Sequence, residues 1–299
     1  MSLPSVSVRL RPLLLAVVGV ISWLAASSGI AGGAEPTPPE KKILFIGKNP
    51  DHAYGSHMYM LVSGMLGRCA ELTPGVTTVV SNGWPQDAAT LAGVSAIVVY
   101  TNPAAELLLE GEHRGQVDAL MRAGCGLVTI HWASSVNQKN LERLGPTWLG
   151  YLGGTWVSNV GLSGGTSPLR QLIPEHPVCR GWKEWEITDE YYLNPTIGAA
   201  KPLLEVTEKN GKEVIVGWVF DRPGGGRSFA TTLGHPYKNF ENESFRRMIV
   251  NGILWTAGME VPAAGAPVNV PADVLALPPA PPPAPPAAAP AVPQPAAAK

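Results

Sequence analysis

Residues 124–135 read Gly-Cys-Gly-Leu-Val-Thr-Ile-His-Trp-Ala-Ser-Ser. The apolar part of this stretch, residues 127–130, is short, partly β-branched and preceded by glycines, which is typical of a strand buried on both faces of a parallel sheet. His131 follows directly where this strand ends. Because ligands of open α/β sheets bind at the carboxyl ends of the strands, His131 is a candidate functional residue. The alternative is a histidine that only caps the strand.

Strands and helices alternate on both sides of this stretch, which predicts βαβ units, right-handed crossovers and a mostly parallel sheet with helices on both faces. We expect a long loop rich in Gly, Ser and Trp over residues 145–168. The expected strands cover residues 42–47, 76–80, 95–101, 169–173, 202–207, 213–220 and 227–233, and the expected helices cover residues 56–69, 112–123, 137–144 and 243–257.

The two ends of the chain differ from its centre. Arg9 and Arg11 precede an apolar run over residues 13–26, and small residues up to Ala34 follow, so we expect residues 1–34 to be a signal peptide and the protein to be exported to the periplasm or beyond the cell. An uncleaved signal anchor is the alternative, and it would be the protein's one membrane contact. The apolar run is shorter than the roughly 20 residues that span a bilayer.

A proline-containing linker over residues 35–40 precedes the expected domain, residues 41–261. Residues 262–299 are nearly all Pro and Ala, so we expect a disordered tail. The formal net charge of −1 gives no electrostatic reason to expect nucleic acid as a partner. The three cysteines form no CxxC pair, and we expect mostly buried, inert thiols. The sequence predicts no oligomeric state.

Further polar residues are expected at the same edge of the sheet as His131. Asn49, Asp51 and His52 follow the first strand, whose carboxyl end faces that edge if the sheet is parallel. His57 is expected one turn into the next helix, as a surface or packing residue. Asp189-Glu190-Tyr191 and Leu233-Gly234-His235 supply the remaining carboxylates and imidazole.

The order of these motifs, with Gly217-Trp218, Gly226-Arg227 and Gly252-Ile253-Leu254-Trp255, resembles the ThuA-like (trehalose utilisation) family. The resemblance implies a flavodoxin-like, class I glutamine amidotransferase-like fold, a three-layer sandwich around a mostly parallel sheet. An amidotransferase of this superfamily has a nucleophilic cysteine at the position of His131 and a glutamate at the position of Tyr237. Cys125 lies at the entry end of the strand, so we do not expect glutamine hydrolysis.

The candidate catalytic residues are His131, His235 and Glu190. Imidazoles and carboxylates that converge on one crevice can hold a divalent ion, here zinc or manganese, with His52, His131 and His235 as the candidate ligands. They can equally act without a metal as general base and acid, or serve only to hydrogen-bond the loops. The candidate substrate-binding residues are Trp132, Asn49, Asp51, Tyr191 and Arg227.

Tryptophans in the expected loops favour a sugar ligand, because an indole face can stack on the apolar face of a pyranose. Trp132 is the preferred candidate because it follows His131. The family resemblance implies sugar catabolism, with a disaccharide or a 3-keto glycoside as substrate and a metal-assisted hydrolase or lyase as the activity. A non-catalytic carbohydrate-binding module or a scaffold is the alternative.

Overall fold

The computed structural model of the protein describes residues 40–282. The expected signal peptide, nearly all of the expected linker and residues 283–299 of the expected tail lie outside the described residues. No helix within residues 40–282 has the length and apolar character that crossing a bilayer requires.

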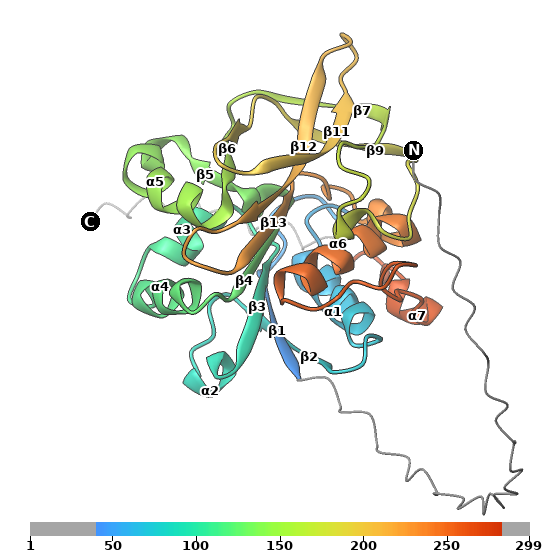
Figure 1. The fold of residues 1–299 in the computed structure, drawn as a ribbon. Coiled ribbons are helices and arrows are strands. Elements are labelled where there is room, and N and C mark those ends of the chain that lie inside the picture. Colours follow the sequence, from blue (N-terminus) through green and yellow to red (C-terminus); the bar gives the residue numbers. More distant parts are fainter. Residues whose placement is uncertain (1–39, 283–299) are drawn as a thin grey trace, which may run out of the picture. The chain divides into compact units, whose positions relative to one another are not determined.

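One eight-stranded sheet forms the centre of the fold (Figure 1). The first five strands in its spatial order run parallel to their neighbours, and the last three join the sheet in antiparallel fashion. The expected mixed α/β fold with a large, mostly parallel sheet is therefore confirmed. In spatial order the strands are β2 (Val76–Asn82), β1 (Lys41–Gly47), β3 (Val94–Val99), β4 (Gly126–Ile130), β13 (Arg227–Thr231), β12 (Glu213–Asp221), β11 (Lys201–Thr207) and β8 (Arg170–Gln171).

The parallel strands are apolar on both faces because helices cover both faces. In β1, Ile43 and Phe45 belong to one hydrophobic cluster, whereas Leu44 and Ile46 belong to a second. Helices α1 (Tyr59–Ala70) and α6 (Glu243–Thr256) pack on the first cluster, and the helices on the opposite side of the sheet in Figure 1 pack on the second. These are α3 (Ala104–Leu109), α4 (Arg114–Arg122) and α5 (Leu141–Leu152).

The expectation of a long loop over residues 145–168 is wrong. Helix α5 continues through Pro146 to Leu152, because Leu144, Trp148 and Leu152 recur at helical spacing and are buried. The glycines and the proline within the helix obscure this helical spacing in the sequence. Two strands follow, so the segment holds regular structure rather than a loop. They are β6 (Gly154–Ser158) and β7 (Leu162–Pro168).

Two small sheets accompany the large one. In the first, β10 (Thr196–Ile197), β6 and β5 (Ser135–Asn137) pair side by side. In the second, β7 pairs with β9 (Glu186–Tyr192) in antiparallel fashion. Strand β9 brings Glu190 beside the residues that follow β4 and β13. The short helix α2 (Ala88–Leu91) completes the elements before β3.

The first part of the expected disordered tail packs on the domain. Residues 262–278, which we call the C-terminal strap, include the four-residue helix α7 (Ala272–Leu275). Ala266 and Val268 are fully buried in the same hydrophobic cluster as α1 and α6, and Asn251 Oδ1 accepts a hydrogen bond from the Ala266 amide at 2.8 Å. The expectation is therefore wrong for this part, because the aliphatic residues among the prolines find a surface to bury against.

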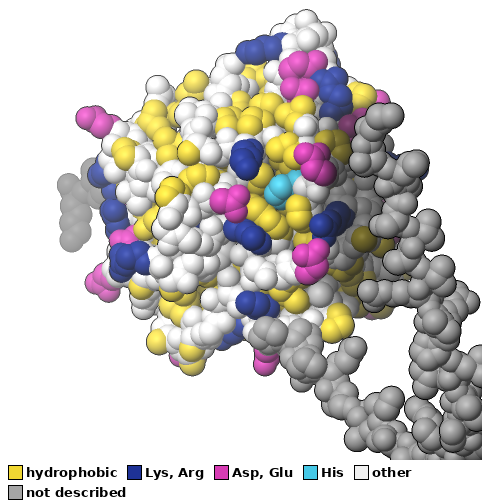
Figure 2. All heavy atoms as spheres, in the orientation of Figure 1, with side chains coloured by type: hydrophobic (Ala, Val, Ile, Leu, Met, Phe, Trp, Pro, Cys, Tyr) yellow, Lys and Arg dark blue, Asp and Glu magenta, His cyan; other side chains and the backbone are white. Residues whose placement is uncertain are grey.

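The three cysteines, Cys69, Cys125 and Cys179, are buried and free, and burial raises the pKa of each thiol. The expectation of buried thiols is thus confirmed. The face of the described residues in Figure 2 carries basic and acidic side chains interspersed with hydrophobic ones.

Candidate functional site

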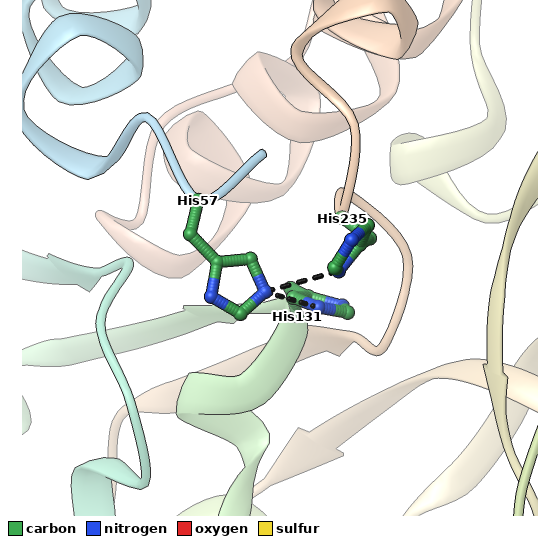
Figure 3. A group of neighbouring side chains, drawn as sticks. All are labelled: His57, His131 and His235. Atoms are coloured by element: carbon green, nitrogen blue, oxygen red, sulfur yellow. Dashed lines mark hydrogen bonds between the residues drawn. The ribbon is translucent and has the colours of Figure 1, made fainter. Parts of the chain in front are cut away.

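Three histidines converge at the carboxyl edge of the parallel strands (Figure 3). His131 follows β4, His235 follows β13, and His57 lies between β1 and α1. One ring nitrogen from each of them lies within 4.8 Å of the others. We call His57, His131 and His235 the histidine cluster. It forms because parallel strands deliver the residues that follow them to one edge of the sheet.

His131 is completely buried, with a backbone φ of 57°. Its Nδ1 lies 2.8 Å from the carbonyl oxygen of Thr232. Because a carbonyl only accepts, Nδ1 carries the proton, and Nε2 presents its lone pair to the cluster. Burial holds the pKa of His131 well below its ordinary value, so the ring is neutral.

His57 is likewise buried and has a positive φ, with a φ of 50° and only 2% of its side chain exposed. Its Nδ1 donates to Asp51 Oδ1 at 2.9 Å, and the Tyr59 hydroxyl donates to the same oxygen at 3.0 Å. Burial lowers the pKa of His57 to about 4. Its Nε2 therefore also offers a lone pair, and it lies 3.1 Å from Nε2 of His131.

Asp51 stays ionised to accept these bonds. Burial opposes its ionisation, but the hydrogen bonds from His52, His57 and Lys48 outweigh that cost and hold its pKa well below the ordinary value. The carboxylate fixes the tautomer and the orientation of the His57 ring, as carboxylates commonly do for metal-ligating histidines.

His235 completes the cluster from the loop after β13. Its Nδ1 lies 3.1 Å from Nε2 of His57 and 3.2 Å from Oε2 of Glu190. Burial opposes protonation of His235, but the contact with Glu190 prevails and raises its pKa. Asp189 holds this loop, because its carboxylate accepts the backbone N–H groups of Gly234 and His235 at 2.6 and 3.0 Å.

Glu190 and Tyr192 bring two further oxygens close to the cluster from β9. Glu190 Oε2 lies 3.8 Å from Nε2 of His131, and the Tyr192 hydroxyl donates to the same nitrogen at 2.9 Å. The Tyr192 ring stacks on Trp156, with ring centroids 3.9 Å apart. These neighbours allow little movement of the His131 ring.

Two of the three nitrogen–nitrogen separations in the cluster are compatible with a divalent ion. Two nitrogens that each lie about 2.0–2.1 Å from a tetrahedral zinc ion are about 3.3 Å apart, close to the 3.1 Å separations observed. Both Nδ1–H groups of the buried rings point away from the centre, to Thr232 and Asp51. Metal-ligating histidines have this second hydrogen bond almost without exception.

Backbone strain gathers at this site. Four non-glycine residues among those described have positive φ: His57, His131, Asn159 and Asn194. The first two belong to the cluster, and Asn159 lines the pocket above it. Such conformations cost about 1–3 kcal/mol each and persist where the surrounding structure fixes them, often at functional sites.

A small pocket of about 80 Å³ opens next to the cluster. Its volume is below that of sites that enclose a whole small-molecule ligand, about 300–1,000 Å³. It therefore admits one edge of a larger molecule. Its lining residues are His52, His57, Trp132, Trp156, Asn159, Leu162, Glu190 and Tyr192.

Several residues selected from the sequence meet at this pocket. The three catalytic candidates, His131, His235 and Glu190, contact one another. Trp132 lines the pocket and donates its indole N–H to Ser158 at 2.9 Å. Asp51 lies behind His57.

His52 differs from the expectation. Its side chain is 39% exposed and its Nδ1 contacts Asp51 at 2.8 Å, so it lies at the mouth of the pocket. The three-histidine group contains His57 in its place. A second group of possible ligands consists of Asp51, His52 and His57.

Three substrate-binding candidates lie apart from the cluster. Arg227 begins β13 and packs on Trp255, at the opposite end of the strand from His235, so its placement at this edge is wrong. Tyr191 points into the core, where its hydroxyl donates to Gly165. Asn49 accepts a hydrogen bond from Asn82, and within residues 40–282 no side-chain hydrogen bond joins it to the cluster.

His57 and Tyr192 were not among the site residues selected from the sequence, and Trp132 was preferred to Trp156. His57 was placed inside a helix from Ser56, but α1 begins at Tyr59 and leaves His57 in the preceding loop. The sequence Asp51-His52 with His57 and Tyr59 close behind is a polar run that the helical spacing obscured. Tyr192 is interpreted from the sequence as an ordinary core aromatic. Trp156 is one of the tryptophans of the expected loop over residues 145–168 that favour a sugar ligand. Both residues are buried.

Cys125 begins the segment that leads into β4, at the far end from His131, and burial raises its pKa to about 12. No cysteine of the described region adjoins the histidine cluster, since the other two, Cys69 and Cys179, contact Val268 and Gln171. The thiolate that an amidotransferase requires is therefore absent from this part of the chain.

Two solved structures have a fold similar to that of this chain. A putative ThuA-like protein from Bacteroides uniformis matches with a TM-score of 0.58 and 16% identity over 75% of this chain and 94% of its own. The cold-adapted β-galactosidase of Rahnella sp. R3 matches with a TM-score of 0.52 and 14% identity over 74% of this chain and 32% of its own. At these identities the likeness concerns the fold alone. No protein of curated function matches the chain.

The profile of the ThuA family, described as trehalose utilisation, matches residues 53–256. This match covers more than half of the chain and includes the three histidines, Glu190 and both pocket tryptophans. The chain therefore belongs to the ThuA family.

Proposed function

We propose that this protein transforms a carbohydrate at the small pocket next to the histidine cluster, which we call the histidine pocket. A divalent zinc or manganese ion would be held there by His57, His131 and His235. Glu190 and Asp51 supply the negative charge that such an ion requires. When bound, the ion would polarise a carbonyl or hydroxyl oxygen of the sugar. His57 replaces His52 in the ligand set expected from the sequence.

The observation that carries this proposal is the contact of the two Nε2 atoms of His57 and His131 at 3.1 Å. Both rings are neutral, and both have their proton on Nδ1. Neither ring can then donate to the other, and the Tyr192 hydroxyl donates to Nε2 of His131 instead. A shared cation would attract both nitrogen lone pairs at once.

Glu190 is the residue suited to move a proton. Its carboxylate lies on the open side of the cluster, with its side chain 31% exposed, and it lines the pocket. A sugar edge in the pocket would lie within reach of Oε2, which can accept a proton from a carbon next to a keto group. This chemistry suits a 3-keto glycoside, in which loss of that proton precedes cleavage of the glycosidic bond.

Turnover of a 3-keto disaccharide tests the proposal. We expect Glu190→Gln and His131→Ala to lower kcat/KM by a factor of about 100 or more, as the loss of a catalytic acid or base does. His113→Gln is the matched control, because His113 stacks on Trp84 and belongs to neither group of possible metal ligands. Unchanged turnover in both site variants, with an unaltered circular dichroism spectrum, would contradict the proposal.

The second candidate is a non-catalytic carbohydrate-binding module or scaffold. The aromatic lining of the pocket, Trp132, Trp156 and Tyr192, favours it, because aromatic faces bind sugars without any chemistry. This candidate predicts saturable sugar binding without turnover, with loss of binding in Trp132→Ala.

We further infer that the protein is exported and that its fold is of the class I glutamine amidotransferase-like type. The basic and apolar pattern of residues 1–34 supports export. The two hydrophobic clusters on opposite faces of the sheet support the three-layer fold. Mature-terminus sequencing of protein secreted by the native host tests the first inference.

A further inference from the structure

Strand β9 continues beyond the histidine pocket along a second, larger cleft. Side chains alternate along a strand, so Glu186, Thr188, Glu190 and Tyr192 share one face of β9. The last two line the histidine pocket, and the first two line a cleft of about 550 Å³. Four residues of strand span about 13 Å.

The opposite wall of this cleft also continues from the cluster. His235 is followed directly by Pro236, which lines the cleft together with Asn239 and Asn242. Asn239 reaches across to β9, where its Nδ2 donates to the Thr188 carbonyl at 3.0 Å and to Asp189 Oδ2 at 2.8 Å. Both walls of the cleft are thus extensions of the chain segments that carry Glu190 and His235.

Two asparagine side chains of the cleft are held by hydrogen bonds that involve only one end of each amide group. Asn239 uses its Nδ2, which leaves Oδ1 as an acceptor without a partner among the described residues. Asn242 uses its Oδ1 to cap α6, where it accepts the N–H groups of Ser244 and Phe245, and its Nδ2 has no partner among the residues described. Paired hydroxyls of a sugar ring match such a fixed acceptor and donor.

Trp185 adds an aromatic surface to the same cleft. Its ring packs edge to face on Trp182 and Phe245, with ring centroids 5.4 and 6.4 Å away, so its orientation is fixed. The residue is only partly buried, in contrast to Trp182. A fixed, partly open indole beside free amide groups is suited to stack on a pyranose ring.

We propose that this cleft, between β9 and residues 236–242, is a second sugar subsite. It takes the ring next to the one whose edge enters the histidine pocket, so the ligand is a glycoside of at least two rings. This inference rests on the proposed carbohydrate function. It goes beyond that function because it names the cleft that would bind the second ring and so select for ligands of two or more rings.

Calorimetric titration of the full-length protein with glucose and trehalose, each also as its 3-keto derivative, tests the subsite. The variants are Glu186→Ala, Trp185→Leu and Asn242→Asp, the last of which keeps a capping oxygen and replaces the N–H donor by a charged carboxylate oxygen. Glu142→Ala, an exposed change on α5, is the matched control. We expect wild-type protein to bind at least one disaccharide about tenfold more tightly than its monosaccharide, since a second stacked ring adds binding energy.

Each subsite variant should reduce this preference by a factor of about five, the size expected for one lost hydrogen bond or stacking contact. Equal wild-type affinity for one and two rings, or an unchanged preference in all three variants, would overturn the subsite while leaving monosaccharide binding at the histidine pocket intact. Absence of binding to every sugar would overturn the proposed function, and the subsite with it.

Discussion

The Nε2 atoms of His57 and His131 lie 3.1 Å apart, although each ring donates its Nδ1 proton to another acceptor. Asp51 and the Thr232 carbonyl thus determine which nitrogen each ring presents to the other. Both residues have a positive φ angle. Positive φ angles and this close nitrogen–nitrogen contact thus occur at one place.

Asp51→Asn should lower zinc affinity by a factor of about 10–100, the usual effect of removing a hydrogen-bonding carboxylate behind a ligating histidine. The amide has no charge, so it supports the basicity of His57 less well. Competition with a chromophoric chelator measures the affinity. Asp273→Asn, an exposed change on the C-terminal strap, should leave the affinity unchanged. Equal zinc affinity in the wild type and Asp51→Asn would show that the carboxylate does not act through His57.

Removal of the chain after residue 261 should lower the free energy of unfolding by about 3 kcal/mol, because the buried Val268 and its apolar neighbours lose their partners. It should also lower zinc affinity. The strap carbonyls of Pro278 and Leu275 accept hydrogen bonds from Tyr54 and Tyr237, which lie in the two loops that carry His57 and His235.

A shorter truncation, after residue 282, is the control for this experiment because it keeps every strap contact named here. Urea denaturation measures the first effect and chelator competition the second. If both truncations behave like the full chain, the strap has no part in stability or in positioning the loops.

His176 should make the protein less stable as the pH falls from 6.5 to 4. Burial, aided by Lys201 and Arg227, lowers its pKa to about 4 against an unfolded value of 6.5, although Asp221 and Glu175 act in the opposite direction. Between these values the unfolded state binds the proton more tightly, so stability rises with pH across this window and is lost on acidification.

The Val178 N–H donates a hydrogen bond to Nδ1 of His176 at 3.2 Å. The variant His176→Asn keeps an acceptor for this N–H. Between pH 7 and pH 4.5 the unfolding free energy of the wild type should fall by about 2 kcal/mol more than that of the variant. Parallel pH profiles of the two proteins would argue against a partly buried, neutral His176.

Two helical glycines should respond in opposite ways to alanine. A Cβ on Gly252 of α6 would lie 2.2 Å from the Phe229 ring, so Gly252→Ala should cost about 1–3 kcal/mol through overpacking. A Cβ on Gly64 of α1 meets no atom within 4 Å, so Gly64→Ala should stabilise by about 0.5–1 kcal/mol. Thermal unfolding of both variants checks the sign. A stable Gly252→Ala protein would mean that α6 does not approach the sheet this closely.

The parallel part of the sheet was predictable because its strands are short, apolar and separated by helices. That pattern also predicts that residues after β1 and β4 share an edge. His235 was assigned to the same site only through the family resemblance, because β13 follows β12 in a hairpin without a helix between them. His57 was not predictable in this way, since a shift of the helix start from Ser56 to Tyr59 decides its surroundings. Tyr192 reaches His131 only through the pairing of β9 with β7, a contact between distant segments that leaves no local pattern.

The C-terminal strap shows the limit of composition as a guide. Pro and Ala dominate residues 262–299, and that content predicts disorder. A few aliphatic residues, among them Val268 and Leu275, nevertheless pack on the cluster beneath α1 and α6. Whether so few side chains can hold a segment in place depends on the surface that they meet, which the segment's own sequence does not contain.

Metal content of the full-length protein, purified without chelator or histidine tag and analysed by elemental mass spectrometry, tests the central claim most directly. We predict one zinc or manganese ion per chain, lost in His57→Ala and retained in His113→Gln. A wild-type protein that takes up neither ion during titration with an excess of each, or a His57→Ala variant that binds as much as the wild type, would contradict the assignment of the histidine cluster as a metal site.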